Sequence, residues 1–553
     1  MTTRSVNLNM LHNDRSDVKL NDLTFRQYMA MTLILSTLNI EHRYPEVTEI
    51  KGIIETKSDR MLDITLRALS KKGLLEYYGL DKSPMLTVPK RNEWLFDLFT
   101  DKLMLERETV TFKDLKRIVK ERELPARYSL TTNAAIQAPL DASKSELLRQ
   151  LNNEKGIVHR WYSYLQDFPP SLVWDKLATY GIKPGQVVLD PFCGSGTTAV
   201  VAKLMGIDAI AVDINPVACF VTSAKCNWSI DLSQLRAEME SLLNDFAAAS
   251  PVLDDIRLSD GFIKIMPKME RNQWLKTKPQ NEVAYLGSRI GEMDDGGYKQ
   301  SLLLALVGAA VEASNVAFCP GTTFYPFRRR DSFSEAFQKK LNAIYEDLYL
   351  LKELLNDTDF GNVAVFREDC RNMSEYIRKE IDFIITSPPY PNDLEYTRQT
   401  RLELYLLGCV RDMDDIRDIK RRMVKGSTKL IFDDSDSAKY VKSFDSIQNV
   451  ANMIGGALKD RNWGWDYPRM IREYFGDIYL TLLEIQKVLK EGKYALLVVG
   501  DQTYKNILIP VGQIICELAN DLKFAWTGLE TLRIRRSTMH SIPLKEEIVV
   551  LKK

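Results

Sequence analysis

The segment Thr386-Ser-Pro-Pro-Tyr390, which follows the apolar run 381–385, brings together groups that could bind a planar base. Two consecutive prolines fix two φ angles and remove two backbone donors, so neither a strand nor a helix can run through them. The stiff turn presents the Ser387 hydroxyl, the Pro388 carbonyl and the Tyr390 ring. Two hydrogen-bond acceptors beside an aromatic plate suit a base that carries an exocyclic amino group. A proline-terminated strand without chemistry is the alternative that this motif alone leaves open.

A second candidate site is the glycine-rich segment Pro191-Phe-Cys-Gly-Ser-Gly-Thr-Thr198, which follows a short apolar run ending at Asp190. A helix over 199–205 and a strand over 209–213 are predicted next, which gives a strand, glycine loop, helix and strand. The glycines let the backbone approach a ligand, and the first amides of the helix face outward. Asp213, at the end of the second strand, stands where a carboxylate accepts hydrogen bonds from both hydroxyls of a ribose.

The carboxylate of Asp190 bears on which nucleotide this loop could bind. The run Gly194-Ser-Gly-Thr-Thr-Ala199 also fits the looser dinucleotide fingerprint, so a dinucleotide site is the competing interpretation. An anion beside a pyrophosphate is unfavourable, whereas an anion beside a cationic amino acid group is favourable. The loop therefore indicates a ligand with a nucleoside at one end and a positive charge at the other, a description that fits S-adenosylmethionine.

These motifs resemble those of the S-adenosylmethionine-dependent DNA amino-methyltransferases, which methylate cytosine-N4 or adenine-N6. The run 190–198 is similar to the family's cofactor motif, Asp213-Ile-Asn-Pro216 to the acidic motif, and Thr386-Ser-Pro-Pro-Tyr390 to the catalytic motif. The resemblance covers about residue 158 to the C-terminus. The cofactor motif comes first, so the permuted order common among relatives with this loop is not expected, nor is their C-terminal recognition domain.

The resemblance implies a role for each motif. Asp213 would hold the ribose, and Asp369 would accept a hydrogen bond from the adenine amino group, with a helix cap as its alternative role. The catalytic residues would be Ser387, Pro388, Pro389 and Tyr390. No metal site and no cysteine nucleophile are expected, so Cys193 would only line the site. The residues predicted to bind the cofactor are Asp190, Pro191, Phe192, Cys193, Gly194, Gly196, Thr197, Thr198, Asp213, Ile214, Asp369, Cys370 and Thr386.

The target base is expected to leave the duplex and stack on Tyr390. Serine at position 387 favours cytosine-N4, because relatives that modify adenine typically have aspartate there; adenine-N6 is the second possibility. An RNA guanine methyltransferase and a catalytically inactive DNA-binding subunit remain further alternatives. The expected partner is double-stranded DNA, and the resemblance also implies a cognate restriction or phage-defence protein.

Composition is compatible with such an enzyme. The chain has 553 residues, of which 45% are hydrophobic and 27% charged, and its formal net charge is zero. Binding to nucleic acid must therefore depend on local basic patches. The seven cysteines form no C-x-x-C pair, which argues against a disulfide framework or a zinc site. With neither a signal peptide nor a membrane-spanning run apparent, we expect a cytoplasmic protein without membrane contact.

The N-terminal part, residues 1–123, is predicted to be a winged-helix-like α+β domain. Helices are expected over 25–38, 46–55 and 58–71, followed by two wing strands near 73–79 and 85–88. In the third helix Leu62, Leu66 and Leu69 share one face, and Arg60, Arg67 and Lys71 lie on the opposite side. Such a helix could enter a major groove. A protein-interaction module with a solvated basic face is the alternative.

A linker is predicted over 124–157, and residues 158–553 are predicted to form the methyltransferase domain. Its fold class is expected to be α/β, a doubly wound, Rossmann-like sheet of seven strands with an antiparallel hairpin at one edge. Two insertions are expected, at about 231–361 and 410–467. Each has a basic cluster, at 328–330 and 420–422, and either insertion or the N-terminal domain could read the DNA sequence.

Overall fold

The chain was examined as a computed structural model. It describes residues 30, 34, 47–53, 59–71, 75–78, 86–87, 156–162, 168–249, 274–318, 322–324, 332–354, 360–460, 464, 466–536 and 542–553. The chain forms two compact units, Met1–Ala135 and Ile136–Lys553. Among the described residues, no helix is both long and apolar enough to cross a membrane.

The described part of the first unit contains two helices and a small hairpin: α2 (Val47–Ile53), α3 (Asp59–Lys71), β1 (Glu76–Tyr77) and β2 (Leu86–Thr87). The two strands pair antiparallel. The predicted apolar stripe of α3 is buried, since Leu62, Leu66 and Leu69 have no exposed surface. Most of the first predicted helix and of the linker lie outside the described residues, as do the ends of both wing strands. The winged-helix assignment stays a prediction.

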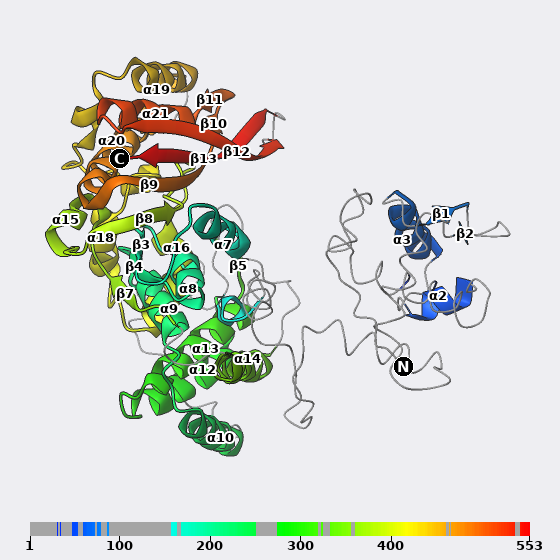
Figure 1. The fold of residues 1–553 in the computed structure, drawn as a ribbon. Helices are drawn as coiled ribbons and strands as arrows, with labels where there is room; N and C mark the ends of the chain where they lie inside the picture. Colours follow the sequence, from blue (N-terminus) through cyan, green and yellow to red (C-terminus); the bar gives the residue numbers. More distant parts are fainter. Residues whose placement is uncertain are drawn as a thin grey trace, which may run out of the picture. The chain divides into compact units, whose positions relative to one another are not determined.

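Seven strands of the second unit form one sheet with the order β12-β13-β9-β8-β3-β4-β7 (Figure 1). The strands are β3 (Val187–Asp190), β4 (Asp208–Val212), β7 (Val363–Phe366), β8 (Ile381–Thr386), β9 (Leu489–Gly500), β12 (Trp526–Arg536) and β13 (Pro543–Lys552). Adjacent strands from β9 to β7 are parallel, whereas β13 runs antiparallel to both neighbours. The predicted seven-stranded α/β sheet with an antiparallel hairpin at one edge is confirmed.

The sheet is buried on both faces. Neighbouring residues of one strand enter opposite apolar clusters, with Val188 in one and Val187 and Leu189 in the other. The first cluster contains residues of α7 (Pro170–Thr179), α8 (Thr197–Leu204) and α9 (Pro216–Cys226), and the second contains residues of α15 (Met373–Tyr376), α20 (Tyr467–Val488) and α21 (Val511–Asp521). This three-layer arrangement explains why the central strands β3, β4 and β8 are almost continuously apolar, whereas β12 at the edge is mostly exposed.

The first insertion adds helices to the cluster of α8 and α9. Its described part contains a hairpin and four helices: β5 (Val316–Phe318), β6 (Thr322–Phe324), α10 (Leu232–Ala249), α12 (Thr277–Gly291), α13 (Gly297–Ala313) and α14 (Phe333–Leu354). Helix α13 is buried nearly all round, as its apolar sequence requires. The basic cluster 328–330 lies outside the described residues.

The second insertion begins after two short helices, α16 (Tyr396–Gln399) and α17 (Arg401–Leu406), and contains α18 (Met413–Arg422) and α19 (Asp445–Leu458). Helix α19 packs against α20. A further hairpin that the sequence did not indicate, β10 (Gln502–Tyr504) and β11 (Ile507–Ile509), follows β9. The two residues of its turn, Lys505 and Asn506, have positive φ values. Because neither is a glycine, the sequence lacks the usual signal of such a turn. Single-turn 3-10 helices complete the described part: η4 (His159–Trp161), η7 (Cys370–Asn372), η8 (Thr428–Leu430) and η9 (Ser437–Val441).

Candidate active site

The glycine loop between β3 and α8 needs glycine at two positions. Gly194 and Gly196 have φ values of 51° and 85°, in the region that side chains disfavour. A Cβ on Gly196 would also lie 2.8 Å from the side chain of Thr222 in α9. The loop is therefore held close to α9. Its backbone lines a cleft at the carboxyl ends of β3, β4 and β8, and the strand order reverses between β3 and β8.

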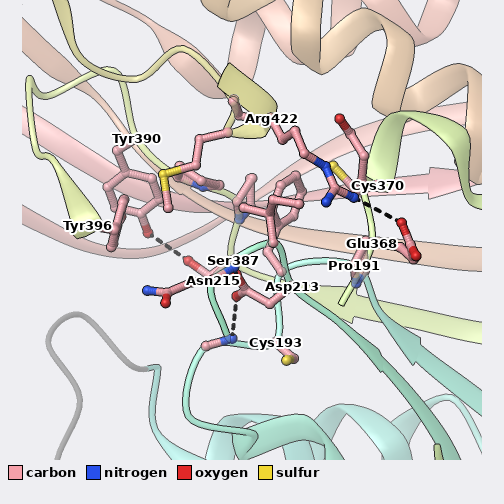
Figure 2. Close-up of a pocket in the computed structure, with 18 of the residues that line it drawn as sticks. Pro191, Cys193, Asp213, Asn215, Glu368, Cys370, Ser387, Tyr390, Tyr396 and Arg422 are labelled. Atoms are coloured by element: carbon pink, nitrogen blue, oxygen red, sulfur yellow. Dashed lines mark hydrogen bonds and ion pairs between the residues drawn. The ribbon is translucent and has the colours of Figure 1, made fainter. Parts of the chain in front are cut away.

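Asp213 follows β4 and faces this cleft (Figure 2). The amide of Gly194 donates to its Oδ2 at 3.1 Å, and the amide of Asn215 donates to its Oδ1 at 2.8 Å. Burial raises the pKa of Asp213 to about 6, although these backbone hydrogen bonds act in the opposite direction. Among the described residues, no cation lies within ion-pair distance of it. A ligand that donates hydroxyl groups would stabilise this carboxylate, and a ribose satisfies that requirement.

Asp190 ends β3 beneath the loop rather than in the cleft. Its side chain is 2% exposed, and its Oδ1 accepts hydrogen bonds from the Thr386 hydroxyl at 2.6 Å and the Phe192 amide at 3.1 Å. Burial raises the pKa of Asp190 to about 6, against the effect of those hydrogen bonds. The sequence argument placed this carboxylate beside a cationic ligand group. In the structure it joins the end of β3 to the end of β8, so it fixes the two loops relative to each other.

The proline turn after β8 has the predicted form. Pro388 is buried, and the Ser387 hydroxyl donates to the Tyr390 hydroxyl at 3.3 Å. The Tyr390 hydroxyl in turn reaches the carbonyl of Val498 at 3.4 Å. Burial raises the pKa of Tyr390 to about 12, so its ring stays neutral at physiological pH. A neutral aromatic face beside the serine hydroxyl can stack on a planar base.

Asp369 lies between β7 and η7 and is part of an ionic network. Its Oδ1 accepts from the Arg371 amide, which makes it a helix cap, and its Oδ2 accepts from Arg371 Nη2 at 2.6 Å. Arg371 Nη1 donates to Asp477 of α20 at 2.6 Å. Burial acts to raise the pKa of Asp369, but the hydrogen bonds and charge of Arg371 outweigh it, and the pKa is lowered. Asp369 therefore stays ionised, and it also lines the cleft.

One cleft brings the two predicted sites together. Its empty space, including the open mouth, is about 940 Å³. Apolar walls from Phe192 and Ile214 beside the Asp213 carboxylate fit a nucleoside. Of the predicted residues, Asp190, Gly196, Thr198 and Thr386 lie outside the lining. The predicted residues that line it are Pro191, Phe192, Cys193, Gly194, Thr197, Asp213, Ile214, Asp369, Cys370, Ser387, Pro388, Pro389 and Tyr390.

Cys193 has no features of a nucleophile. Its side chain is 4% exposed, and its sulfur lies 3.5 Å from the Thr222 hydroxyl. Burial raises the pKa of its thiol well above the usual value, so the reactive thiolate is disfavoured.

Some lining residues were not predicted from the sequence. Asn215 lies within the acidic motif, and Phe168 ends the run 159–168, which is rich in aromatic residues, so local signals were present for both. The segment 422–424 and Leu430 reach the cleft from the second insertion, for which the sequence contained no signal. Arg422 pairs with Glu368 at 2.9 Å along the cleft, as Figure 2 shows. The unpredicted lining residues are Phe168, Asn215, Glu368, Tyr396, Arg422, Met423, Val424 and Leu430.

The sequence of this chain is similar to those of known methyltransferases. Residues 81–223 match the DNA methylase family, and residues 177–272 match the RMKL-like methyltransferase domain. The Type II methyltransferase M.AvaI of Nostoc sp. is 24% identical over 462 residues, which cover 77% of this chain and 90% of the relative. M.BsoBI of Geobacillus stearothermophilus is 22% identical over 431 residues, covering 69% and 82%. M.MvaI of Kocuria varians is 24% identical over 393 residues, covering 66% and 82%.

These matches agree with the geometry of the cleft. The matched range 81–223 contains the glycine loop and Asp213. Methyltransferases of this family use S-adenosylmethionine, and the cleft has the carboxylate and apolar walls that its nucleoside requires. The matches and the cleft together support an S-adenosylmethionine-dependent amino-methyltransferase similar to those of the N4/N6 family.

Proposed function

We propose that this enzyme methylates the exocyclic amino group of a base flipped out of duplex DNA, and that the base is cytosine, modified at N4. The observation that carries the proposal is the shared cleft, in which Asp213 and the glycine loop lie on one side and the turn 387–390 on the other. A cofactor whose nucleoside binds at Asp213 and a base that stacks on Tyr390 would enter this cleft from opposite sides and meet within it. The match of residues 81–223 to the DNA methylase family supports modification of DNA.

The turn 387–390 would activate the amino nitrogen. The Ser387 hydroxyl oxygen and the Pro388 carbonyl would accept its two hydrogens, which favours a pyramidal nitrogen with a free electron pair. S-adenosylmethionine supplies a methyl group bound to a positively charged sulfur. The nitrogen electron pair would form the new bond to the methyl carbon, the sulfur would keep the electrons of the broken carbon–sulfur bond, and the nitrogen would then lose one proton to solvent water. No covalent bond between enzyme and base is needed.

Aromatic side chains would offset the cost of removing the base from the duplex. Extrusion costs on the order of a few kcal/mol. Tyr390 and Tyr396 both line the cleft, and stacking on an aromatic ring is worth roughly 1–3 kcal/mol per base. The Tyr396 ring is a second stacking surface that the motif itself did not indicate.

Serine at position 387 supports cytosine over adenine. A serine hydroxyl is neutral, whereas adenine-modifying relatives typically have a carboxylate at this position. Adenine-N6 methylation is the second candidate, since the same two acceptors could hold its amino group. We further propose that the enzyme acts with a cognate restriction nuclease, because its relatives are Type II methyltransferases.

The test is incubation of the purified chain with methyl-labelled cofactor and, in separate reactions, mixed-sequence duplex DNA or RNA, followed by nucleoside mass spectrometry. We expect labelled N4-methylcytosine; labelled N6-methyladenine would support the second candidate. Label found only in RNA, or in neither polymer, would refute DNA methylation.

A further inference from the structure

The hairpin β12–β13 extends beyond the rest of the sheet. Strand β9 ends at Gly500, which pairs with Glu546 of β13. The hairpin continues through three further pairs, in which Ile534, Arg535 and Arg536 of β12 face 545, 544 and 543 of β13. Figure 1 shows the two red strands reaching past the end of β9. Because β9 is parallel to β8, the projecting end lies at the same edge of the sheet as the cleft.

The projecting end lies next to the catalytic turn. A Cβ on Gly500 would lie 3.4 Å from Cε2 of Tyr390 and 3.4 Å from Nη2 of Arg535. The guanidinium and the ring therefore occupy the two sides of the space that this glycine leaves empty. Arg535 Nη2 also donates to the carbonyl of Asp501 at 3.3 Å, which holds the side chain in this position.

Arg535 differs from the nearby Arg533 in that no carboxylate pairs with its guanidinium among the described residues. Arg533 pairs with Glu546 at 2.7 Å. Arg535 is exposed, and the adjacent Ile534 is 63% exposed. The hairpin thus places a positive charge that no close carboxylate neutralises, together with an apolar side chain, in solvent beside the cleft.

The basic cluster of the second insertion contrasts with this arrangement. Lys420 pairs with Glu395 at 2.7 Å, Arg421 with Asp434 at 2.6 Å, and Arg422 with Glu368 at 2.9 Å. Each of these charges is matched by a carboxylate of the same chain. Compared with this cluster, Arg535 is therefore the better candidate for binding an external anion.

We propose that the projecting end of β12–β13 binds the phosphate backbone of the DNA strand beside the flipped base, with Arg535 as the main contact. This inference rests on the proposed function. A flipped nucleotide leaves its phosphates at the cleft mouth, and an arginine fork binds phosphate oxygens through paired N–H groups. The contact would fix the register of the strand relative to Tyr390 without reading sequence.

The experiment compares duplex binding by the full chain and by Arg535→Gln, using fluorescence anisotropy over a range of salt concentrations. We expect Arg535→Gln to weaken binding about tenfold, as loss of one charge-assisted contact implies. We expect the slope of log affinity against log salt to fall by roughly one. Arg535→Lys should keep the slope, because it keeps the charge. Cofactor affinity, measured by calorimetry, should be unchanged in both variants. This measurement also shows whether the variants are folded.

Arg378→Gln is the matched control, because Arg378 is an exposed arginine that precedes β8, at the opposite edge of the sheet. Equal duplex affinities and salt slopes for Arg535→Gln and Arg378→Gln would overturn the inference. If the wild-type chain still methylates duplex DNA in that case, only the phosphate contact is refuted. A wild-type chain that neither binds nor methylates duplex would refute both this inference and the proposed function.

Discussion

At the scale of single residues, the site depends on a few polar groups held by buried contacts. Asp190 and Thr386 bond to each other behind the cleft, whereas Asp213 and Ser387 face into it. The first pair fixes geometry and the second pair would contact ligands. Substitutions at the two facing residues should therefore separate cofactor binding from methyl transfer.

Ser387→Ala should lower the turnover number by roughly 100-fold, the usual effect of removing one hydrogen bond that strengthens in the transition state. Cofactor affinity should be unchanged, because the hydroxyl lies in the turn assigned to the base. Single-turnover methyl transfer and calorimetry measure the two quantities. Ser446→Ala, at a serine of α19 that bonds to Glu517, is the control. Normal turnover by Ser387→Ala would contradict the assignment of this turn.

The raised pKa of Asp213 predicts a pH effect on cofactor binding. Its carboxylate must be ionised to accept two ribose hydrogens, and its folded pKa is about 6. Affinity should therefore be constant above pH 7 and fall as the pH drops through 6. The pKa of Asp213 is higher in the folded state than in the unfolded state. The free energy of unfolding therefore falls as the pH rises from the unfolded pKa to about 6.

Calorimetric titrations between pH 5.5 and 8, a range chosen to span about two units around that pKa, would measure this effect. Asp213→Asn should bind the cofactor weakly, with a smaller pH dependence. Wild-type affinity that does not change across this range would refute the role of Asp213.

At the scale of elements, a buried carboxylate, Asp477, helps to join the second insertion to the cofactor side of the cleft. Asp477 of α20 accepts hydrogen bonds from Arg371 at 2.6 Å, the Ser437 hydroxyl at 2.6 Å and the Lys425 amide at 3.0 Å. Its side chain has no exposed surface. Asp477 thus connects the insertion to Asp369 through a single arginine.

Asp477→Asn should reduce the free energy of unfolding by roughly 3–5 kcal/mol, because it leaves the buried charge of Arg371 without one of its partners. Cofactor affinity should also fall, since Arg371 then orients Asp369 less firmly. Denaturant unfolding and calorimetry test the two effects. Asp521→Asn, an exposed position where the carboxylate accepts from Tyr479, is the matched control. Equal stability of both variants would show that the network is not stabilising.

At the scale of the whole molecule, the N-terminal unit carries the other described group of basic residues. Helix α3 buries its leucines and leaves Arg60 and Lys71 exposed, while Arg67 pairs with Asp63 at 2.6 Å. If this unit binds DNA as a winged helix would, the two exposed charges face the backbone or the groove.

The double variant Arg60→Gln, Lys71→Gln should bind every duplex more weakly and lower the salt slope by up to roughly two. Methyl transfer at saturating DNA should be unchanged, because the cleft belongs to the second unit. Arg67→Gln is the control with a smaller expected effect, since Asp63 already neutralises Arg67. Wild-type affinity of the double variant would favour the protein-interaction alternative for this unit.

The sequence by itself determined the elements whose signals are local. Gly194 and Gly196 indicate a loop with positive φ, and two prolines end β8 wherever it lies in the sheet. The predicted strands differ from the structure by a few residues, mostly at their ends, because strand ends depend on pairing. Apolar runs and carboxylates at strand ends were sufficient to predict the α/β sheet and the residues on both sides of the cleft.

Only the tertiary structure decided which of those residues share the cleft and what holds them. Asp190 lies beneath the loop because Thr386, far away in the sequence, supplies its hydrogen bond. Asp369 is paired through Arg371 with Asp477, and the segment 422–424 returns to the cleft from an insertion. The position of Arg535 beside Tyr390 follows from the register of β13 on β9. All of these contacts join segments distant in sequence, and no local pattern of residues encodes them.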